Sequence, residues 1–176
     1  MTERITLMLG GARSGKSRLA EQLAEHYLHN RLVKKLLYVA TAEVKDNEMA
    51  ERVKHHQAAR SAHWTVVEEA WALPEVIADT DEQTCILVDC LTLWLTHGLC
   101  EQGIDAYIKQ KSALLRALGD TQAKVILVSN EVGHGIVPLG ELSRTFVEQS
   151  GWLHQDIAQL ADRVDFIMAG CTLRIK

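Results

Sequence analysis

The octapeptide Gly10–Ser17, GGARSGKS, has a glycine, four further residues and then Gly-Lys-Ser. This spacing is that of a phosphate-binding P-loop, whose glycines let backbone N–H groups approach phosphate oxygens without an intervening Cβ. Lys16 can reach the β- and γ-phosphates of a nucleotide, and the Ser17 hydroxyl can ligate Mg²⁺. The octapeptide therefore predicts a site for a nucleoside triphosphate with magnesium, but it does not specify the reaction.

The segments on either side of the octapeptide support this prediction. Ile5–Leu9, which precedes it, is a short apolar run suited to a buried strand. Lys16–Asn30, which follows, is expected to be a helix whose positive N-terminal dipole points at the bound anion. Strand, glycine-rich turn and helix in this order are the context that a phosphate-binding loop requires.

Apolar runs and helical stretches alternate along the rest of the chain. The other strands are expected at Leu36–Ala40, Cys85–Val88, Val125–Val128 and Phe166–Ala169. The other helices are expected at Asn47–Arg60, Leu73–Ala78, Leu91–Leu99, Ala106–Leu118 and Leu139–Leu160. This pattern predicts the α/β class: a single P-loop domain over residues 1–176, with a mostly parallel sheet covered by helices on both faces.

Length and composition limit the possible functions. A chain of 176 residues with 47% hydrophobic residues can form one domain with a sizeable core. The formal net charge of −4 argues against non-specific nucleic-acid binding, which requires a basic surface. No apolar stretch is long enough to span a bilayer, so we expect no membrane span.

The start of the chain and its cysteines suggest a location. A strand and the P-loop follow the first residues directly, which leaves no room for a signal peptide. The cysteines lack Cys-x-x-Cys spacing and are expected to be buried, reduced thiols rather than disulfide partners or zinc ligands; they are Cys85, Cys90, Cys100 and Cys171. Together these features predict a cytoplasmic enzyme.

The residues that follow the strands are the first candidates for chemistry, because ligands of such folds bind at the carboxyl ends of the strands. Asp89 ends an apolar strand. In P-loop enzymes a carboxylate at this position holds Mg²⁺ directly or through water. The alternative is that Asp89 caps the following helix. Thr41 ends another strand near the expected nucleotide, but a lone hydroxyl there is more typical of a cap or turn.

A second polar turn follows the strand at Val125–Val128. Asn130 and Glu131 would face phosphates or substrate there, or Asn130 would satisfy local backbone groups instead. Gly133 and Gly135 indicate close backbone approach or a mobile loop.

Adjacent histidines occur in the expected helix Asn47–Arg60. His55 and His56 are about 100° apart around a helix, so they do not share a face and are poorly spaced for one metal ion. Both could be surface residues. Alternatively, the His56 imidazole could attack a nucleotide α-phosphorus, with Arg60 one turn later neutralising phosphate charge. The spacing alone leaves both interpretations open.

Several segments together resemble a known enzyme family. Besides Gly10–Ser17, the segments are Tyr38–Ala42, Glu48–His56, Ala62–Trp64, Val88–Leu95 and Ser129–Pro138. Over essentially its whole length, the chain resembles the bifunctional adenosylcobinamide kinase / adenosylcobinamide-phosphate guanylyltransferase family. Members of this family resemble RecA-like P-loop domains and are known as homotrimers.

The resemblance implies two reactions in late cobalamin assembly. ATP or GTP phosphorylates the aminopropanol hydroxyl of adenosylcobinamide. GTP then transfers GMP to an enzyme histidine with loss of pyrophosphate. Adenosylcobinamide phosphate attacks that intermediate and gives adenosylcobinamide-GDP. The remaining alternative is a different small-molecule P-loop kinase in which the paired histidines are inert.

The resemblance also implies roles for particular residues. His56 is aligned with the guanylylated histidine, with His55 as the other choice, and Lys16 serves phosphoryl transfer. Glu68 looks like the family's acidic contact to guanine. The nucleotide-binding residues expected in this way are Gly10, Gly11, Ala12, Arg13, Ser14, Gly15, Lys16, Ser17, Val39, Ala40, Thr41, Gln57, Ala58, Ala59, Arg60, Glu68 and Asp89. Ser17 and Asp89 would hold Mg²⁺.

Overall fold

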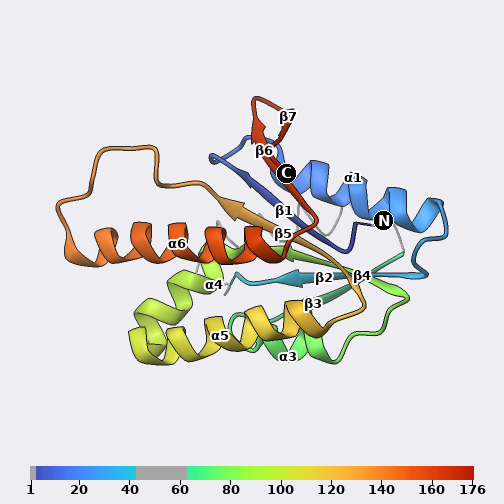
Figure 1. The fold of residues 1–176 in the computed structure, drawn as a ribbon, viewed down its shortest axis with the longest axis horizontal. Coiled ribbons are helices and arrows are strands. Elements are labelled where there is room, and N and C mark those ends of the chain that lie inside the picture. The colour runs from blue at the N-terminus through green and yellow to red at the C-terminus, as the bar shows by residue number, and fades with distance from the viewer. Residues whose placement is uncertain (1–2, 43–62) are drawn as a thin grey trace.

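A computed structural model describes residues 3–42 and 63–176, and its centre is a seven-stranded sheet (Figure 1). Its strands are β1 (Ile5–Gly10), β2 (Lys35–Ala40), β3 (Trp64–Glu68), β4 (Thr84–Asp89), β5 (Lys124–Asn130), β6 (Arg163–Met168) and β7 (Cys171–Arg174). The order across the sheet is β3-β2-β4-β5-β1-β6-β7, and only β7 pairs antiparallel. The predicted mostly parallel sheet is confirmed.

Helices cover both faces of this sheet, as predicted. They are α1 (Lys16–His29), α3 (Leu73–Ala78), α4 (Leu91–His97), α5 (Ile104–Asp120) and α6 (Glu141–Leu160), with a π-helical turn at Gly98–Gln102. In Figure 1, α1 lies on one side of the sheet, whereas α3, α4, α5 and α6 lie on the other. The connection from β5 to α6 extends away from the body of the protein.

The alternation of side chains along each strand divides the core into two clusters. On β5, Val125 and Leu127 pack in the cluster under α3–α6, whereas Ile126 and Val128 pack in the cluster under α1. The same alternation continues past the apolar part of β5. Ser129 and Glu131 therefore belong to the α6 side, and Asn130 belongs to the α1 side.

The predicted boundaries are mostly correct to within two or three residues. The strand predicted at Phe166–Ala169 begins earlier, at Arg163, and Ala169 lies in the turn after it. The helix predicted at Leu139–Leu160 begins at Glu141, and the one predicted at Leu91–Leu99 changes to π-helix at Gly98. The predicted helix Asn47–Arg60 lies outside the described residues.

Two strands were not predicted, and both lie at edges of the sheet. In β3 the side chains are at least partly exposed, and in β7 all are exposed, so neither strand has the continuous apolar run that marks the central ones. β7 forms a hairpin with β6, in which Asp165 pairs with Arg174. The buried Asp165 carboxylate accepts hydrogen bonds from Arg163 Nε at 2.7 Å and Arg174 Nε at 3.0 Å.

The expectation of buried cysteines is correct for only half of them. All four thiols are free, but Cys100 and Cys171 are exposed while Cys85 and Cys90 are buried. Cys100 lies in the π-helical turn and Cys171 begins the exposed edge strand β7, positions that their apolar sequence neighbours do not reveal. Within residues 3–42 and 63–176, no helix combines the length and the apolar character needed to cross a membrane.

Candidate nucleotide site

The predicted P-loop connects the carboxyl end of β1 to the first turn of α1. Gly15, at the N-terminal boundary of α1, has a φ of 101°, which glycine adopts readily and other residues rarely do. A Cβ on Gly10 would lie 2.2 Å from the Ile167 carbonyl oxygen, so the loop and β6 approach too closely for a side chain. Gly170 N donates to Ser14 O at 2.8 Å, which ties the β6–β7 turn to the loop.

Lys16 is the buried charged residue of this loop. Its side chain is buried, and its Nζ donates to Gly11 O at 2.7 Å and to Asn130 Oδ1 at 2.8 Å. Burial lowers the pKa of Lys16, and the nearby Asp89 carboxylate opposes that shift. A cation held in this way is ready to exchange its neutral acceptors for phosphate oxygens.

Asp89 ends β4, and β5 separates that strand from β1. Its Oδ2 accepts a hydrogen bond from Tyr38 Oη at 2.9 Å. The position before α4 belongs to Cys90, and α4 has no side-chain cap. The alternative interpretation of Asp89 as a helix cap is therefore wrong. The carboxylate lies at the same edge of the sheet as the P-loop, with a tyrosine orienting it.

Thr41 has the structural role expected of a lone hydroxyl. Its Oγ1 donates to Cys90 O at 2.7 Å and accepts from Cys90 N at 2.8 Å. The side chain is buried and joins the end of β2 to the segment after β4. This pair of bonds holds the carboxyl ends of two neighbouring strands together.

Asn130 connects the P-loop to helix α4. While Oδ1 accepts from Lys16, Nδ2 donates to Thr92 Oγ1 on α4 at 3.2 Å. Thr92 in turn lies 2.9 Å from Cys90 Sγ. The amide thus bonds Lys16 of the P-loop and Thr92 of a second helix, rather than local backbone.

Ser129 and Glu131, the sequence neighbours of Asn130, both have side chains that approach His154 on α6. His154 is buried, and its Nε2 lies 2.7 Å from Ser129 Oγ. Its Nδ1 lies 3.6 Å from Glu131 Oε2. Burial lowers the pKa of His154, and the Glu131 carboxylate acts in the opposite direction. The end of β5 is consequently fixed from both faces of the sheet.

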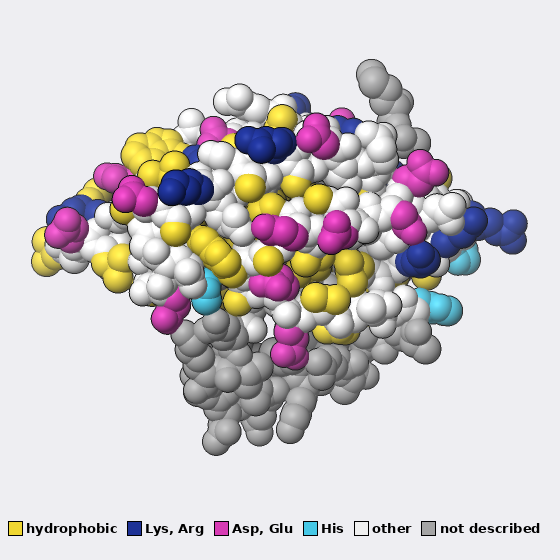
Figure 2. All heavy atoms as spheres, turned by 90° about the horizontal axis from the view of Figure 1, so that it is seen from below, with side chains coloured by type: hydrophobic (Ala, Val, Ile, Leu, Met, Phe, Trp, Pro, Cys, Tyr) yellow, Lys and Arg dark blue, Asp and Glu magenta, His cyan; other side chains and the backbone are white. Residues whose placement is uncertain are grey.

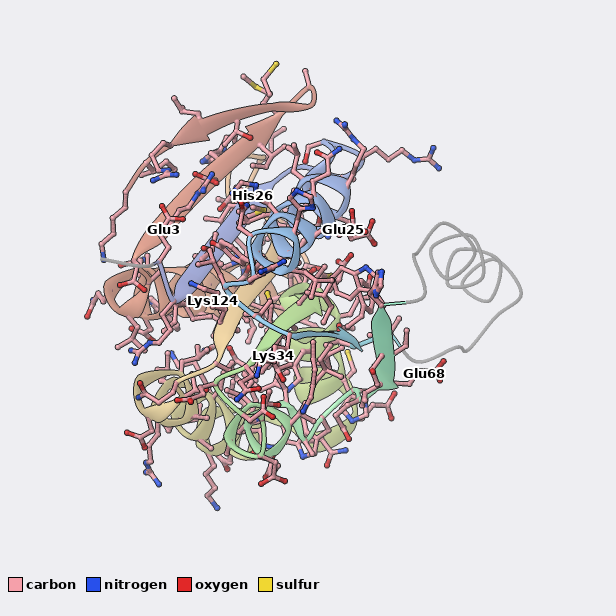
Figure 3. All side chains as sticks on the ribbon, turned by 90° about the vertical axis from the view of Figure 1, so that its right-hand side faces the viewer. Glu3, Glu25, His26, Lys34, Glu68 and Lys124 are labelled. Atoms are coloured by element: carbon pink, nitrogen blue, oxygen red, sulfur yellow. The ribbon has the colours of Figure 1, made fainter. Side chains whose placement is uncertain are left out.

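The remaining predicted residues fall into three groups, the first of which belongs to the P-loop and β2. Gly11, Ala12 and Arg13 are exposed in the P-loop, whereas Val39 and Ala40 are buried in β2. Glu68 is exposed at the end of β3, the edge strand separated from β1 by three others (Figure 3). The third group lies outside the described residues: His55, His56, Gln57, Ala58, Ala59 and Arg60.

The structure adds three side chains that the sequence prediction did not include: Tyr38, Thr92 and His154. A sequence signal existed only for His154. Ser150, Leu153, His154 and Ile157 recur at the spacing of one helical face, and all four are buried in α6. Tyr38 and Thr92 reach the site through strand order and helix packing, which spacing along the chain does not encode.

Comparison with known proteins identifies the family. The family model for cobinamide kinase / cobinamide phosphate guanyltransferase matches residues 6–175. The chain belongs to this family. The match begins in β1 and ends after β7, so it includes every strand of the sheet.

Curated relatives of the family share nearly the full length. The chain is 48% identical over 171 residues to the bifunctional adenosylcobalamin biosynthesis protein CobP of Pseudomonas aeruginosa, covering 97% of this chain and 96% of the relative. It is 37% identical over 184 residues to the protein CobU of Escherichia coli, which bears the same description, covering 97% and 98%. The predicted family resemblance is confirmed.

Two solved structures with low sequence identity share the fold. The flagellar accessory protein FlaH from Methanocaldococcus jannaschii has a TM-score of 0.52 at 15% identity, covering 98% of this chain and 78% of that one. A second solved structure, described as an ATPase domain, has a TM-score of 0.50 at 14% identity, covering 94% and 70%. These likenesses confirm the predicted P-loop, RecA-like fold class and nothing more specific.

The close contact at Gly10 leads to a stability prediction. Gly10→Ala places a methyl group against the Ile167 carbonyl oxygen and is expected to lower the free energy of unfolding by about 1–3 kcal/mol, because backbone atoms must move. Urea denaturation measures the change. Gly11→Ala is the control, since a Cβ there meets nothing within 4 Å. Equal stability of the two variants would contradict the prediction.

The buried imidazole leads to a prediction about pH. Because the folded-state pKa of His154 is below its ordinary value of about 6.5, the unfolded state binds the proton more readily, and this residue's contribution to stability falls as the pH falls. His154→Gln removes that proton uptake. Urea denaturation at about pH 7 and about pH 5 should show a smaller loss of stability for the variant than for the wild type. Parallel losses would show that His154 does not contribute.

Proposed function

We propose that this chain is a bifunctional adenosylcobinamide kinase and adenosylcobinamide-phosphate guanylyltransferase. In this proposal residues 1–176 act as one domain. The family match over residues 6–175 carries the proposal, and the buried Lys16 between Gly11 and Asn130 supplies the phosphate-binding chemistry it requires. The curated relatives, which are named bifunctional adenosylcobalamin biosynthesis proteins, support the same conclusion.

In the first reaction, the corrinoid hydroxyl oxygen bonds to the γ-phosphorus of ATP or GTP, and the bond to the bridging oxygen breaks. Backbone N–H groups of Gly10–Ser17 and the Lys16 ammonium would bind the phosphates and neutralise the charge that develops on them. Asn130 would keep Lys16 at the loop and accept its hydrogen bond whenever the phosphate does not. The product is adenosylcobinamide phosphate.

Ser17 and Asp89 would hold Mg²⁺. Magnesium takes one or two protein oxygen ligands together with phosphates and water, so a pair of oxygen donors fits this ion. Among the described residues there is no cluster of three His, Cys, Asp or Glu side chains, which a site closed by protein ligands alone would need. When bound, the ion supplies positive charge to the β- and γ-phosphate oxygens. Tyr38 orients the Asp89 carboxylate that would face it.

In the second reaction, a His56 nitrogen would bond to the α-phosphorus of GTP, and pyrophosphate would leave. An oxygen of adenosylcobinamide phosphate would then bond to that phosphorus, and the imidazole would leave. Glu68 would contact the guanine, while Val39–Thr41 and Gln57–Arg60 would line the nucleotide. His55 is the alternative nucleophile. These assignments depend on the family pattern.

The proposed substrates are corrinoids and nucleotides, and the proposed location is the cytoplasm. We also propose that the assembly is a homotrimer and that no nucleic acid is a partner. The net charge of −4 supports the last point. On the face that includes α3 and α5, acidic side chains of the described residues are interspersed with apolar ones across the centre, and adjoining lysines and arginines lie at the right-hand edge of the view (Figure 2). A nucleic-acid surface would need a basic patch across such a face.

The P-loop assignment is tested by Lys16→Ala. We expect both phosphorylation of cobinamide and use of GTP to fall by about 10²–10³ or more, because a preorganised charge at the phosphates is lost. Initial rates with γ-labelled ATP and α-labelled GTP measure the effect. Lys34→Ala is the matched control, since Lys34 is exposed before β2 at the opposite end of the sheet. A normal rate in folded Lys16→Ala would refute the assignment.

The covalent intermediate is tested by His56→Asn. Incubation with α-labelled GTP should leave an acid-labile adduct on the wild type and none on this variant, because asparagine cannot act as the nucleophile. Phosphorylation of cobinamide should persist in the same variant, and His55→Asn should keep the adduct. Loss of the adduct only in His55→Asn would move the nucleophile by one residue. An adduct on both variants would show that neither histidine is the nucleophile. No adduct on the wild type would favour the alternative, a P-loop kinase with inert paired histidines.

A further inference from the structure

Glu131 lies closer in the sheet to the P-loop strand than the other acidic residues at the ends of described strands. β5 pairs directly with β1, Asn130 lies opposite Gly10, and Glu131 N donates to Gly10 O at 3.0 Å. Asp89 ends β4, one strand farther away, and Glu68 ends the edge strand β3. The backbone of Glu131 therefore lies against the first residue of the P-loop, and its carboxylate lies at the same end of the sheet, on the α6 side.

The carboxylate of Glu131 is oriented but has acceptor capacity to spare. Its side chain is 18% exposed. Oε1 accepts from Gly133 N at 2.6 Å, and Oε2 lies 3.6 Å from His154 Nδ1. An ionised carboxylate offers about four lone-pair sites, and these contacts use about two of them. An acceptor site therefore remains for a hydroxyl that approaches from solvent.

His154 and Ser129 hold this carboxylate in place. Both ring nitrogens are satisfied when the Ser129 hydroxyl donates to Nε2, at 2.7 Å, and a protonated Nδ1 faces Glu131. Ser129 is only 1% exposed, so its hydroxyl cannot meet a substrate and serves to fix the ring. The three side chains form a chain that starts in the core and ends at the partly exposed Glu131.

We propose that Glu131 is the catalytic base of the kinase step, with His154 and Ser129 as positioning residues. This inference rests on the proposed function. The corrinoid hydroxyl oxygen forms its bond to the γ-phosphorus, the bond to the bridging oxygen breaks, and the nucleoside diphosphate leaves with that electron pair. The hydroxyl proton passes to a Glu131 oxygen and from there to water, so the carboxylate is regenerated.

This assignment makes Glu131 necessary for one reaction only. The acceptor in the guanylyl transfer is a phosphate monoester, which has a second pKa near 6 and carries little removable proton at neutral pH. A neutral imidazole attacks through a lone pair and also needs no base at the attacking nitrogen. A base at Glu131 is therefore needed when the acceptor is a hydroxyl, and neither step of GMP transfer needs it.

The experiment compares three reactions of Glu131→Gln. With cobinamide and γ-labelled ATP, kcat should fall by about 10²–10⁴, the usual contribution of a general base, with KM for ATP unchanged. The covalent adduct with α-labelled GTP and the transfer of GMP to cobinamide phosphate should stay at wild-type rates. Glu141→Gln is the matched control, because Glu141 is exposed at the start of α6 in the segment that follows. This control should leave all three reactions unchanged.

Each outcome decides the proposal. A wild-type rate of cobinamide phosphorylation in Glu131→Gln would overturn it. An equal fall in all three reactions would also overturn it, because Glu131 would then be structural. Glu131→Asp should recover part of kcat, since it restores a carboxylate. His154→Gln should lower kcat for phosphorylation without changing KM for ATP or GMP transfer. If the wild type phosphorylates no cobinamide, the proposed function itself fails.

Discussion

The buried Lys16 ammonium is the interaction on which the rest of the site depends. A cation withdrawn from water must be compensated, and here Gly11 O and Asn130 Oδ1 provide the compensation. Asn130 can do so only because β5 ends beside β1, with Asn130 opposite Gly10. Strand pairing in the sheet thus sets the position of a charge that the P-loop sequence alone does not fix. Thr92 and His154 then restrain β5 from two helices.

The sequence predicts the local parts of this arrangement well. GGARSGKS specifies a loop between strand and helix because its glycines and lysine have few other uses at that spacing. The strand before Asp89 and the strand before Asn130 are readable as apolar runs, since both are buried on two faces. The same rule explains why β3 and β7 were missed: edge strands do not need an apolar run.

Contacts between distant segments account for what the sequence does not reveal. Tyr38 binds Asp89 because β2 and β4 are neighbours, although 51 residues separate the two in sequence. His154 could be assigned to the buried face of α6 from its spacing, but not to Ser129 and Glu131, whose partners depend on how α6 crosses the sheet. The hydrogen-bond partner of Asn130 shows the same limit. Whether its side chain meets phosphate, local backbone or Lys16 depends on the pairing of β5 with β1.

The link between Gly170 and the P-loop bears on how the protein is made. β1 leaves the ribosome long before β6, yet one of its edges pairs with β6, and the Ser14 carbonyl receives its hydrogen bond from Gly170. Asp162 also binds the backbone of Arg4 and Ile5. A nascent chain therefore holds its P-loop without its final support until β6 and the turn after it have been synthesised. The P-loop therefore gains this hydrogen bond only after nearly the whole chain has been synthesised.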